Sequence, residues 1–403
     1  MANFELMREL TQSAKTKIVL LVMDGLGGLP IEAGGKTELE SAHTPNMDRL
    51  AAEGTLGRLI PVEHGVAPGS GPAHLGLFGY DPLVYPIGRG VLESFGVGLP
   101  VGAQDVAVRG NFVSLDENGL ISDRRAGRIS SAAAAPLVEK LKQIQLPGVE
   151  VEVKHVQEYR FAAVMRGVGL SADLNSTDPQ KTGVAPLPVT ANNPSAQASA
   201  DLWNQWIAAG QELLKNDFPA NGFTLRGFSG DPQLPTYAEN YKLNAACVAV
   251  YPMYRGLAKL VGMDVQNFPG NTPEDEFNAV AKIWNDFDFF FIHIKYTDSR
   301  GEDGKFAEKA AVIEQVDAAL PILLGLKPDV LLITGDHSTP AKLKSHSWHP
   351  VPLLLWAPAT HLPDLADHFG ERACMSGGLG TMYSRDLMPV ALAHAGRLQK
   401  YGA

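Results

Sequence analysis

Three aspartates follow three apolar segments of the chain. Asp24 ends the run KIVLLVMD, Asp298 lies in KYTDSRGED after DFFFIHI, and Asp336 with His337 follows DVLLITG. Such near-continuous apolar runs are typical of buried parallel strands, and ligands of open parallel sheets bind beyond the carboxyl ends of the strands. Three carboxylates at one edge would repel one another unless cations neutralise them. The combination therefore predicts a metal site, although a single aspartate after a strand is usually a turn or cap residue.

Two further side chains could complete this metal site. Glu302 follows Asp298 by four residues, so a helical turn would place both carboxylates on one side. His346 lies in SHSWHPVP, nine residues after His337. Mixed histidine and carboxylate ligands suit zinc, manganese, cobalt or iron better than an all-oxygen calcium site. His349 could be a ligand, a neighbour of a ligand or an ordinary loop residue.

A serine in a turn rich in glycine and proline could act as a nucleophile. Ser70 lies in PGSGP, directly before a short apolar segment that we expect to be helical. A hydroxyl at a helix N-terminus faces backbone N–H groups, which favours a phosphate esterified to it, and a bound metal ion would lower its pKa. The alternative is that Ser70 only caps the helix. His74 could contact a phosphate, hold the loop or simply pack.

The elements that must position these residues alternate between strands and helices. The predicted strands are residues 17–23, 288–294 and 329–334, and another apolar strand follows His346. The predicted helices are residues 44–53, 72–78, 256–263, 273–287, 306–324 and 385–394. This alternation is typical of an α/β fold with a mostly parallel sheet.

The middle of the chain has a different pattern. Short runs of alternating polarity, such as VEVEVKHVQEYRFAAVMRG, are joined by segments rich in proline and glycine. This pattern indicates antiparallel strands in a smaller α+β domain. We therefore expect residues 105–219 to be inserted into one α/β core made of residues 1–104 and 220–403.

Composition narrows the class of protein. The 403 residues include 45% hydrophobic and 19% charged residues, as in ordinary globular proteins, and the formal net charge is −10. A diffuse negative charge disfavours nucleic acid or an anionic membrane as a partner. The start has no long apolar run, so we expect a cytoplasmic protein with no membrane span. We expect Cys247 and Cys374 to be reduced thiols, because no CxxC spacing exists. The sequence predicts no oligomeric state.

Several motifs together carry a family resemblance. The runs MDGLGG, HTPNMDRLAAEG, APGSGPAHLGLFGYDP, DRRAGRI, STDPQKTG, KYTDSRGEDG, TGDHSTP and HSWHPVP occur in this order. The chain thereby resembles the archaeal-type, cofactor-independent phosphoglycerate mutases of the alkaline phosphatase superfamily, from Lys17 to about Leu392. The resemblance implies an alkaline-phosphatase-like core, with a mostly parallel sheet covered by helices on both faces and an inserted smaller α+β cap domain that binds substrate.

The resemblance also implies an activity. Members interconvert 3-phosphoglycerate and 2-phosphoglycerate without 2,3-bisphosphoglycerate, through a phosphoserine that would form on Ser70. Two divalent metal ions are implied, which we expect to be manganese, with magnesium, cobalt or zinc as alternatives. By motif, the ligands of one ion would be Asp24, Ser70, Asp336 and His337. Those of the other would be Asp298, Glu302 and His346.

One residue departs from the family pattern. Archaeal relatives usually read GHDG where this chain reads GEDG, so Glu302 stands at the position of a histidine ligand. Glutamate still binds divalent metals, but it adds negative charge and a harder oxygen, which favours manganese or magnesium. The substitution also leaves alternative reactions open: phosphotransfer to another small hydroxy compound such as homoserine, or hydrolysis by a metallophosphatase.

A substrate with a carboxylate and a phosphate calls for basic side chains. Forked guanidinium groups bind such anions in two-point contacts, and the run DRRAGR supplies several of them beside an aspartate that could hold a glycerate hydroxyl. The candidates are Asp123, Arg124, Arg125, Arg128, Arg160, Arg226 and Lys295. The alternative is that several of these are solvated surface residues or members of internal ion pairs.

Overall fold

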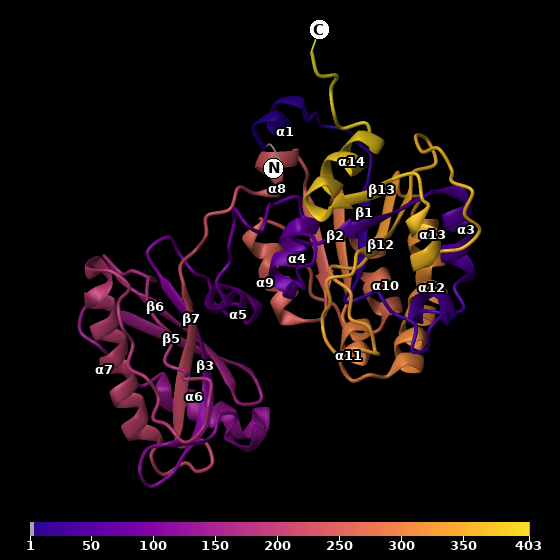
Figure 1. The fold of residues 1–403 in the computed structure, drawn as a ribbon. Helices are drawn as coiled ribbons and strands as arrows, with labels where there is room; N and C mark the ends of the chain where they lie inside the picture. Colours follow the sequence, from indigo (N-terminus) through magenta and orange to yellow (C-terminus); the bar gives the residue numbers. More distant parts are fainter. Residues whose placement is uncertain (1–3, 403) are drawn as a thin grey trace. The chain divides into compact units, whose positions relative to one another are not determined.

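The computed structural model describes residues 4–402, which form two compact units. The first unit comprises Met1–Pro86 and Leu234–Ala403, and the second comprises Ile87–Gln233. The first unit contains the alternating strands and helices, and the second contains the antiparallel strands (Figure 1). No helix in the described range is long and apolar enough to cross a membrane.

An eight-stranded sheet forms the centre of the first unit, with the strand order β13-β2-β12-β11-β1-β10-β8-β9. The strands are β1 (Ile18–Met23), β2 (Thr55–Ile60), β8 (Ala245–Ala249), β9 (Asp264–Val265), β10 (Phe289–Ile294), β11 (Val330–Thr334), β12 (Val351–Trp356) and β13 (Gly380–Tyr383). Strand β1 pairs in parallel with β10 and β11, whereas β12 runs antiparallel to β11 and β2. Every side chain of β1, β10 and β11 is buried, as the apolar runs predicted.

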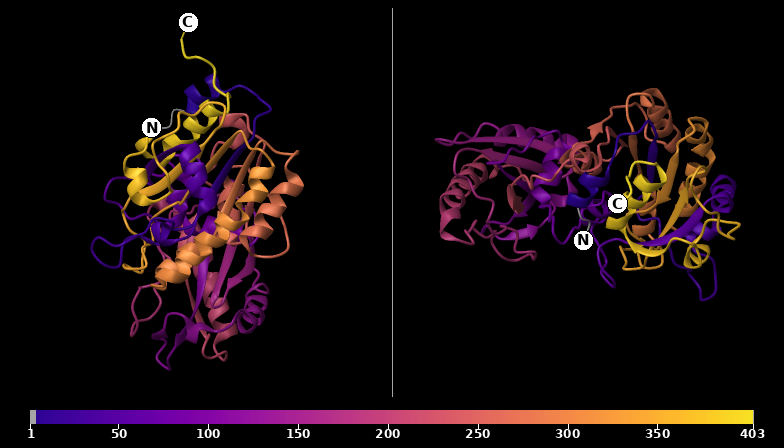
Figure 2. Two further views of the ribbon diagram at one scale, coloured as in Figure 1. Left: turned by 90° about the vertical axis from the view of Figure 1, so that its right-hand side faces the viewer. Right: turned by 90° about the horizontal axis from the view of Figure 1, so that it is seen from above.

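Helices lie on both faces of this sheet (Figures 1 and 2). They are α1 (Phe4–Leu10), α2 (Glu38–Ser41), α3 (Pro45–Glu53), α4 (Ser70–Leu77), α8 (Tyr237–Tyr241), α9 (Pro252–Leu260), α10 (Pro273–Ile283), α11 (Tyr296–Glu302), α12 (Phe306–Gly325), α13 (Glu371–Met375) and α14 (Leu387–His394). Helix α12 contacts α10, α11, α2 and α3, and α4 contacts α9. The predicted α/β class with a mostly parallel sheet is confirmed.

Local sequence signals explain where helices begin. Thr272 caps α10 by accepting a hydrogen bond from the Asp275 backbone N–H, and the Asp275 side chain accepts one from the Thr272 N–H in return. Pro273 occupies the first turn, where its missing N–H costs nothing. Helix α2 begins with the same reciprocal cap between Thr37 and Glu40.

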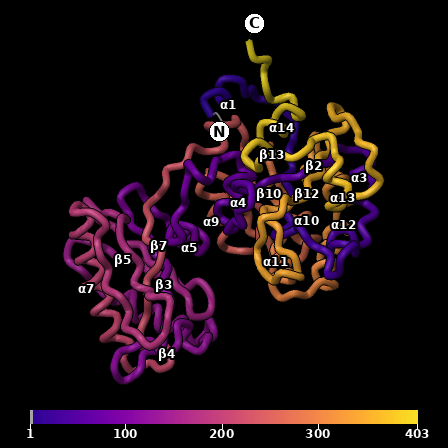
Figure 3. Tube along the Cα trace, in the orientation of Figure 1, coloured from indigo at the N-terminus to yellow at the C-terminus, as the bar shows by residue number. Residues whose placement is uncertain are grey.

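The second unit is a five-stranded antiparallel sheet packed against helices (Figures 1 and 3). Its elements are α5 (Arg89–Gly96), β3 (Val106–Leu115), β4 (Ile121–Asp123), α6 (Ser131–Leu141), β5 (Glu150–Gln157), β6 (Arg160–Arg166), α7 (Gln197–Leu214) and β7 (Gly222–Ser229). Strand β3 pairs with β4, β6 and β7. Trp206 of α7 is fully buried against Phe161 and Phe223, and Trp203 is fully buried against Phe228.

The bounds of the second unit differ from the predicted insertion of residues 105–219. The unit begins at Ile87 because α5 packs on β3 and β7, and it ends at Gln233 because β7 is hydrogen-bonded to β3. The sequence pattern assigned both segments to the core, since neither carries an alternating run of its own. Cys247 and Cys374 are free and buried, as expected.

Candidate active site

The three aspartates of the sequence pattern meet at one edge of the large sheet. Asp24 directly follows β1, Asp336 follows β11 by two residues, and Asp298 lies in α11 after β10. Because β1 lies between β10 and β11 and all three run in parallel, their carboxyl ends are neighbours. Asp24 and Asp336 are fully buried, and Asp298 is 2% exposed.

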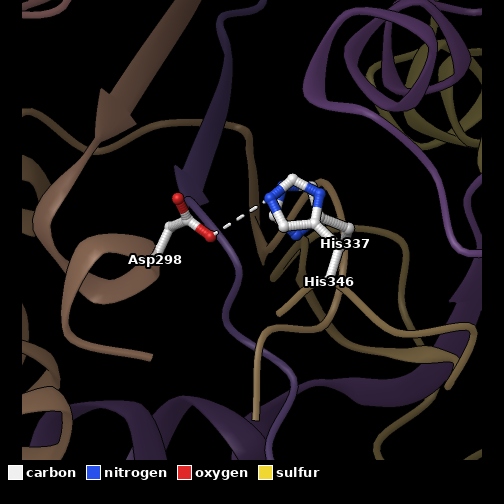
Figure 4. A group of neighbouring side chains, drawn as sticks. All are labelled: Asp298, His337 and His346. Carbon is white, nitrogen blue, oxygen red and sulfur yellow. Dashed lines mark ion pairs between the residues drawn. The ribbon is translucent and has the colours of Figure 1, made fainter. Parts of the chain in front are cut away.

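Two histidines complete two compact groups of ligand atoms. Asp24, Asp336 and His337 form one group, and Asp298, His337 and His346 form the other, with the ligand atoms of each group within 4.8 Å of one another. His337 Nε2 lies 3.4 Å from Asp24 Oδ1 and 3.2 Å from Asp336 Oδ2. Figure 4 shows the second group, in which the rings of His337 and His346 stack with centroids 3.6 Å apart. Because His337 belongs to both groups, it joins them.

The buried oxygens of the first group fit a cation. Asp24 Oδ1 and Asp336 Oδ2 are buried and form no well-directed hydrogen bond, although imidazole nitrogens of His337 and His74 lie 3.2–3.4 Å from them. A buried carboxylate oxygen without a partner costs free energy, which a coordinated cation would offset. Two carboxylates and an imidazole are donors that manganese, zinc or cobalt accepts. The residues present therefore fit a divalent metal ion.

Burial and neighbouring charges set the protonation of these groups. Burial lowers the pKa of His337 to about 4, so the ring is neutral and has a free lone pair for a metal. Burial alone would raise the pKa of Asp336, but His337 and His74 hold it well below its ordinary value. Burial, reinforced by Asp336, raises the pKa of Asp24 well above its ordinary value. One of the two neighbouring carboxyls thus resists ionisation unless a cation is bound.

Lys295 lies between two of the aspartates. Its ammonium donates to Asp24 Oδ2 at 2.8 Å and to Asp298 Oδ2 at 2.5 Å. Burial alone would lower the pKa of Lys295, but the two carboxylates raise it. Burial would likewise raise the pKa of Asp298, and Lys295 lowers it instead. The lysine expected at the substrate therefore contacts proposed metal ligands and supplies part of their countercharge.

Ser70 is the first residue of α4, and its hydroxyl faces His337, which belongs to both groups of ligand atoms. Its Oγ lies 3.4 Å from His337 Nε2. His74, one turn later in the same helix, contacts the Ser70 carbonyl at 2.8 Å and Asp336 Oδ2 at 3.2 Å through Nδ1. His346 Nδ1 contacts the Pro68 carbonyl at 2.8 Å, which leaves Nε2 facing Asp298 Oδ1 at 3.6 Å. The two histidines thus tie the serine loop to the carboxylates.

Glu302 and His349 occupy different positions relative to these groups. Glu302 ends α11, one turn after Asp298, and its Oε1 lies 3.7 Å from His346 Nε2. Its side chain is 54% exposed, so it borders the second group from the solvent side. His349 instead contacts the Ser347 hydroxyl at 3.0 Å and stacks on Trp348.

Three residues of the site were missed in the sequence. Tyr254 of α9 donates to Asp24 Oδ2 at 2.5 Å and stacks on His293, whose Nε2 lies 3.6 Å from the same oxygen. Thr339 Oγ1 lies 2.8 Å from Asp298 Oδ1 and 3.0 Å from His337 Nδ1. A histidine inside the apolar run FFFIHI was a usable signal, but nothing in the sequence of α9 singled out Tyr254.

The second unit contains a pocket lined mainly by guanidinium groups. Its volume is about 260 Å³, and its lining residues are Arg89, Arg109, Asn111, Arg124, Arg125, Tyr159, Arg160 and Arg226. The predicted residues Arg124, Arg125, Arg160 and Arg226 thus gather in one place. The sequence analysis did not single out the other four lining residues, which are Arg89, Arg109, Asn111 and Tyr159. Such a concentration of positive charge suits an anionic ligand.

The other two predicted residues of this unit, Asp123 and Arg128, do not line this pocket. The Asp123 carboxylate accepts hydrogen bonds from the backbone N–H groups of Arg125 and Gly127. Arg128 has a φ of 53°, in the left-handed region, and does not line the pocket.

Asp178 orients two of the arginines. Arg124 donates to both of its carboxylate oxygens, at 3.2 Å and 2.8 Å, and Arg226 lies 3.4 Å away. Burial alone would raise the pKa of Asp178, but Arg124 holds it below its ordinary value. Asp178 thus holds the Arg124 guanidinium in a two-point contact and lies beside that of Arg226.

Comparisons with known proteins cover nearly the whole chain. A family model described as 2,3-bisphosphoglycerate-independent phosphoglycerate mutase matches residues 51–221. Two relatives are each named probable 2,3-bisphosphoglycerate-independent phosphoglycerate mutase. The one from Thermotoga neapolitana is 50% identical, and the match covers 98% of each chain. The one from Aquifex aeolicus is 48% identical, and the match covers 99% of this chain and 100% of the relative.

Two solved structures share the fold. A Pyrococcus horikoshii protein is 31% identical with a TM-score of 0.82, and covers 97% of this chain and 100% of its own. A protein from Thermoplasma acidophilum, described as a cofactor-independent phosphoglycerate mutase, is 28% identical with a TM-score of 0.74, covering 94% and 100%.

Proposed function

Because the chain belongs to the 2,3-bisphosphoglycerate-independent phosphoglycerate mutases, we propose that it interconverts 3-phosphoglycerate and 2-phosphoglycerate through a phosphoserine on Ser70, with two divalent metal ions. The observation that carries this proposal is the position of Ser70. Its hydroxyl lies 3.4 Å from His337, the residue shared by both compact groups of ligand atoms. A nucleophile beside two candidate cation sites suits phosphoryl transfer assisted by two metal ions.

The proposed ligands follow the two groups. One ion would be held by Asp24, Ser70, Asp336 and His337, and the other by Asp298, Glu302 and His346. The unpartnered oxygens of Asp24 and Asp336 and the neutral His337 ring support the first assignment. The 3.6 Å and 3.7 Å separations of His346 Nε2 from Asp298 and Glu302 support the second. The oxygen-rich second set favours manganese, with magnesium, cobalt or zinc as alternatives.

The chain's own residues would carry the reaction in two mirror-image steps. Bound ions would lower the pKa of the Ser70 hydroxyl and stabilise charge on the phosphoryl oxygens. In the first step Ser70 Oγ forms a bond to phosphorus, the bond from phosphorus to the glycerate oxygen breaks, and the serine proton passes to that oxygen. In the second step the other glycerate hydroxyl attacks phosphoserine and returns the proton to Ser70. Helix α4 presents backbone N–H groups to the phosphorylated serine.

The arginine pocket is proposed to bind the anionic groups of the substrate. Arg124, held by Asp178, and the neighbouring Arg226 carry guanidinium groups that suit a carboxylate or phosphate. Arg160 lines the same pocket and is proposed to contribute positive charge. Asp123 is proposed to act through the turn that it stabilises, and Lys295 through Asp24 and Asp298.

A coupled assay tests the proposal. Purified protein with manganese and 3-phosphoglycerate, linked to enolase, should produce phosphoenolpyruvate, and Ser70→Ala should abolish the product. Ser130→Ala is a matched control, because Ser130 also precedes a helix and its hydroxyl only caps the Ala133 N–H. Full activity of Ser70→Ala, or release of inorganic phosphate without isomerisation, would contradict the proposal.

A further inference from the structure

A buried lysine joins two loops that carry three of the seven proposed metal ligands, Asp24, Asp336 and His337. We define the first loop as residues 24–29 and the second as residues 336–341. We propose that Lys309, together with Glu38, is a positioning residue that holds these loops in register so that their side chains can bind metal. The inference rests on the proposed metal site and adds to it a residue that contacts neither substrate nor ion.

Lys309 lies in the first turn of α12 and is fully buried. Its Nζ donates to the carbonyl oxygens of Gly25 at 2.8 Å, Gly27 at 3.1 Å and Thr339 at 2.9 Å. An ammonium group has three N–H donors, whereas a neutral amine has two. Only the charged form of Lys309 can therefore donate a hydrogen bond to each of the three carbonyls. One side chain thus satisfies three carbonyls from both loops.

Glu38 makes the complementary contacts to backbone N–H groups. Its Oε1 accepts from Ala341 at 2.7 Å and its Oε2 from Leu29 at 3.1 Å, again one contact in each loop. Glu38 is fully buried at the start of α2. Burial lowers the pKa of Lys309, and the charge of Glu38 counters that effect. The opposite charges thereby support one another while each fixes backbone groups of opposite polarity.

The loops meet too closely to be held by side-chain packing. A Cβ on Gly27 would lie 1.9 Å from Ser338 Oγ, so only glycine permits this approach. The Thr339 backbone N–H lies 3.2 Å from the Gly25 carbonyl and 3.1 Å from the Gly27 carbonyl. Three carbonyl oxygens consequently converge on the space that Lys309 Nζ fills. Without a cation there, the three carbonyl groups would lose a shared donor and their dipoles would repel one another, which would weaken the contact between the loops.

A shift of either loop would reach the proposed ligands directly. Asp24 precedes Gly25, and the Thr339 side chain contacts both Asp298 Oδ1 and His337 Nδ1. Removing the Lys309 ammonium would therefore loosen ligands of both groups. Mutation of a residue that positions metal ligands typically lowers metal affinity by about 10- to 100-fold.

Lys309→Met tests the inference, with Lys17→Met as the matched control. Lys17 also donates to a backbone carbonyl, that of Phe287 at 2.6 Å. It lies just before the first residue of β1, at the end of the strand away from Asp24. In metal-free protein, Lys309→Met should increase hydrogen exchange of the two loops at least tenfold, and calorimetric titration should show at least tenfold weaker manganese binding. Lys17→Met should leave both quantities within twofold of wild type. Unchanged loop exchange and unchanged affinity in Lys309→Met would overturn the inference.

A second variant serves if Lys309→Met does not fold. Glu38→Gln keeps one acceptor oxygen but turns an N–H₂ group towards a backbone N–H of one loop, so exchange in that loop should rise and manganese affinity should fall by about tenfold. Wild-type exchange rates and affinity in a folded Glu38→Gln variant would overturn the inference. Exchange is measured without metal, so failure of wild-type protein to bind manganese would refute the proposed function separately.

Discussion

Replacement of Glu302 by glutamine isolates the contribution of one carboxylate to the proposed second metal site. Glu302→Gln keeps the size and the end-of-helix position of the side chain in α11 and removes only its charge. His346 and Asp298, the other proposed ligands of that site, keep their contacts to Pro68 and Thr339. The perturbation is therefore confined to the solvent-facing border of the site.

The expected loss of metal affinity in Glu302→Gln follows from the distance of Glu302 to the site and from its exposure to solvent. Glu302 Oε1 lies 3.7 Å from His346 Nε2, so an ion held by His346 would lie within about 4 Å of the carboxylate. Two unit charges 4 Å apart interact by about 1 kcal/mol in water. Because the Glu302 side chain is 54% exposed, we use the interaction energy in water. A divalent ion doubles this energy. The loss is about 2 kcal/mol, or roughly 30-fold in the dissociation constant of one ion.

Calorimetric titration with manganese measures this loss. Wild-type protein should bind two ions, and Glu302→Gln should weaken one of them about 30-fold while leaving the other unchanged. Glu302→His should bind both ions but prefer zinc or cobalt over manganese more strongly than wild type, because imidazole replaces a harder oxygen donor. Asp303→Asn is the matched control, since Asp303 is a neighbouring exposed acid that pairs with Arg300.

Two outcomes would refute this reasoning. An equal loss of affinity at both sites in Glu302→Gln would show that the two groups of ligands do not act separately. An unchanged affinity in Glu302→Gln, together with unchanged metal preference in Glu302→His, would exclude Glu302 from the coordination of either ion.

Three further predictions concern other parts of the molecule. Burial raises the pKa of Glu371 from its ordinary 4.5 to about 7, so wild-type stability should fall as pH rises from 5 to 8, by up to roughly 3 kcal/mol; Glu371→Gln should flatten this dependence in urea unfolding, and an identical slope would contradict it. Arg124→Met and Arg226→Met should each raise KM for 3-phosphoglycerate by roughly 10- to 100-fold with a smaller change in kcat, whereas unchanged steady-state kinetics would exclude them from substrate binding. Trp206→Ala, in the core of the second unit, should lower the free energy of unfolding by about 3–5 kcal/mol, and a loss under 1 kcal/mol in urea unfolding would contradict the packing.

The central strands could be read from the sequence because burial on both faces leaves a distinct mark. Continuous apolar runs identified β1, β10 and β11, and the rule that ligands lie beyond strand ends brought their aspartates together. The outer strands were harder to assign. Strand β2 carries an arginine within TLGRLI, and the four-residue β13 has no side chain that is fully buried. The pairing of β2 with β12, and of β13 with β2, depends on tertiary contacts that no local pattern records.

The first and last residues of the second unit could not be predicted from local sequence patterns for a related reason. Strand β7 belongs to this unit because it pairs with β3, from which it is distant in the sequence, and helix α5 belongs to it because α5 packs on both strands. In the pocket, Arg109 was missed because an arginine inside a strand gives no indication of which face it lies on. Asp178 was missed because its importance comes from two arginines 54 and 48 residues away.

Anomalous diffraction from manganese-soaked crystals tests the two-ion site most directly. The proposal predicts two manganese peaks, one within coordination distance of Asp24, Asp336 and the Ser70 hydroxyl, and the other beside Asp298 and His346. A single peak, or two peaks that both leave the Ser70 hydroxyl uncoordinated, would contradict activation of this serine by a pair of metal ions.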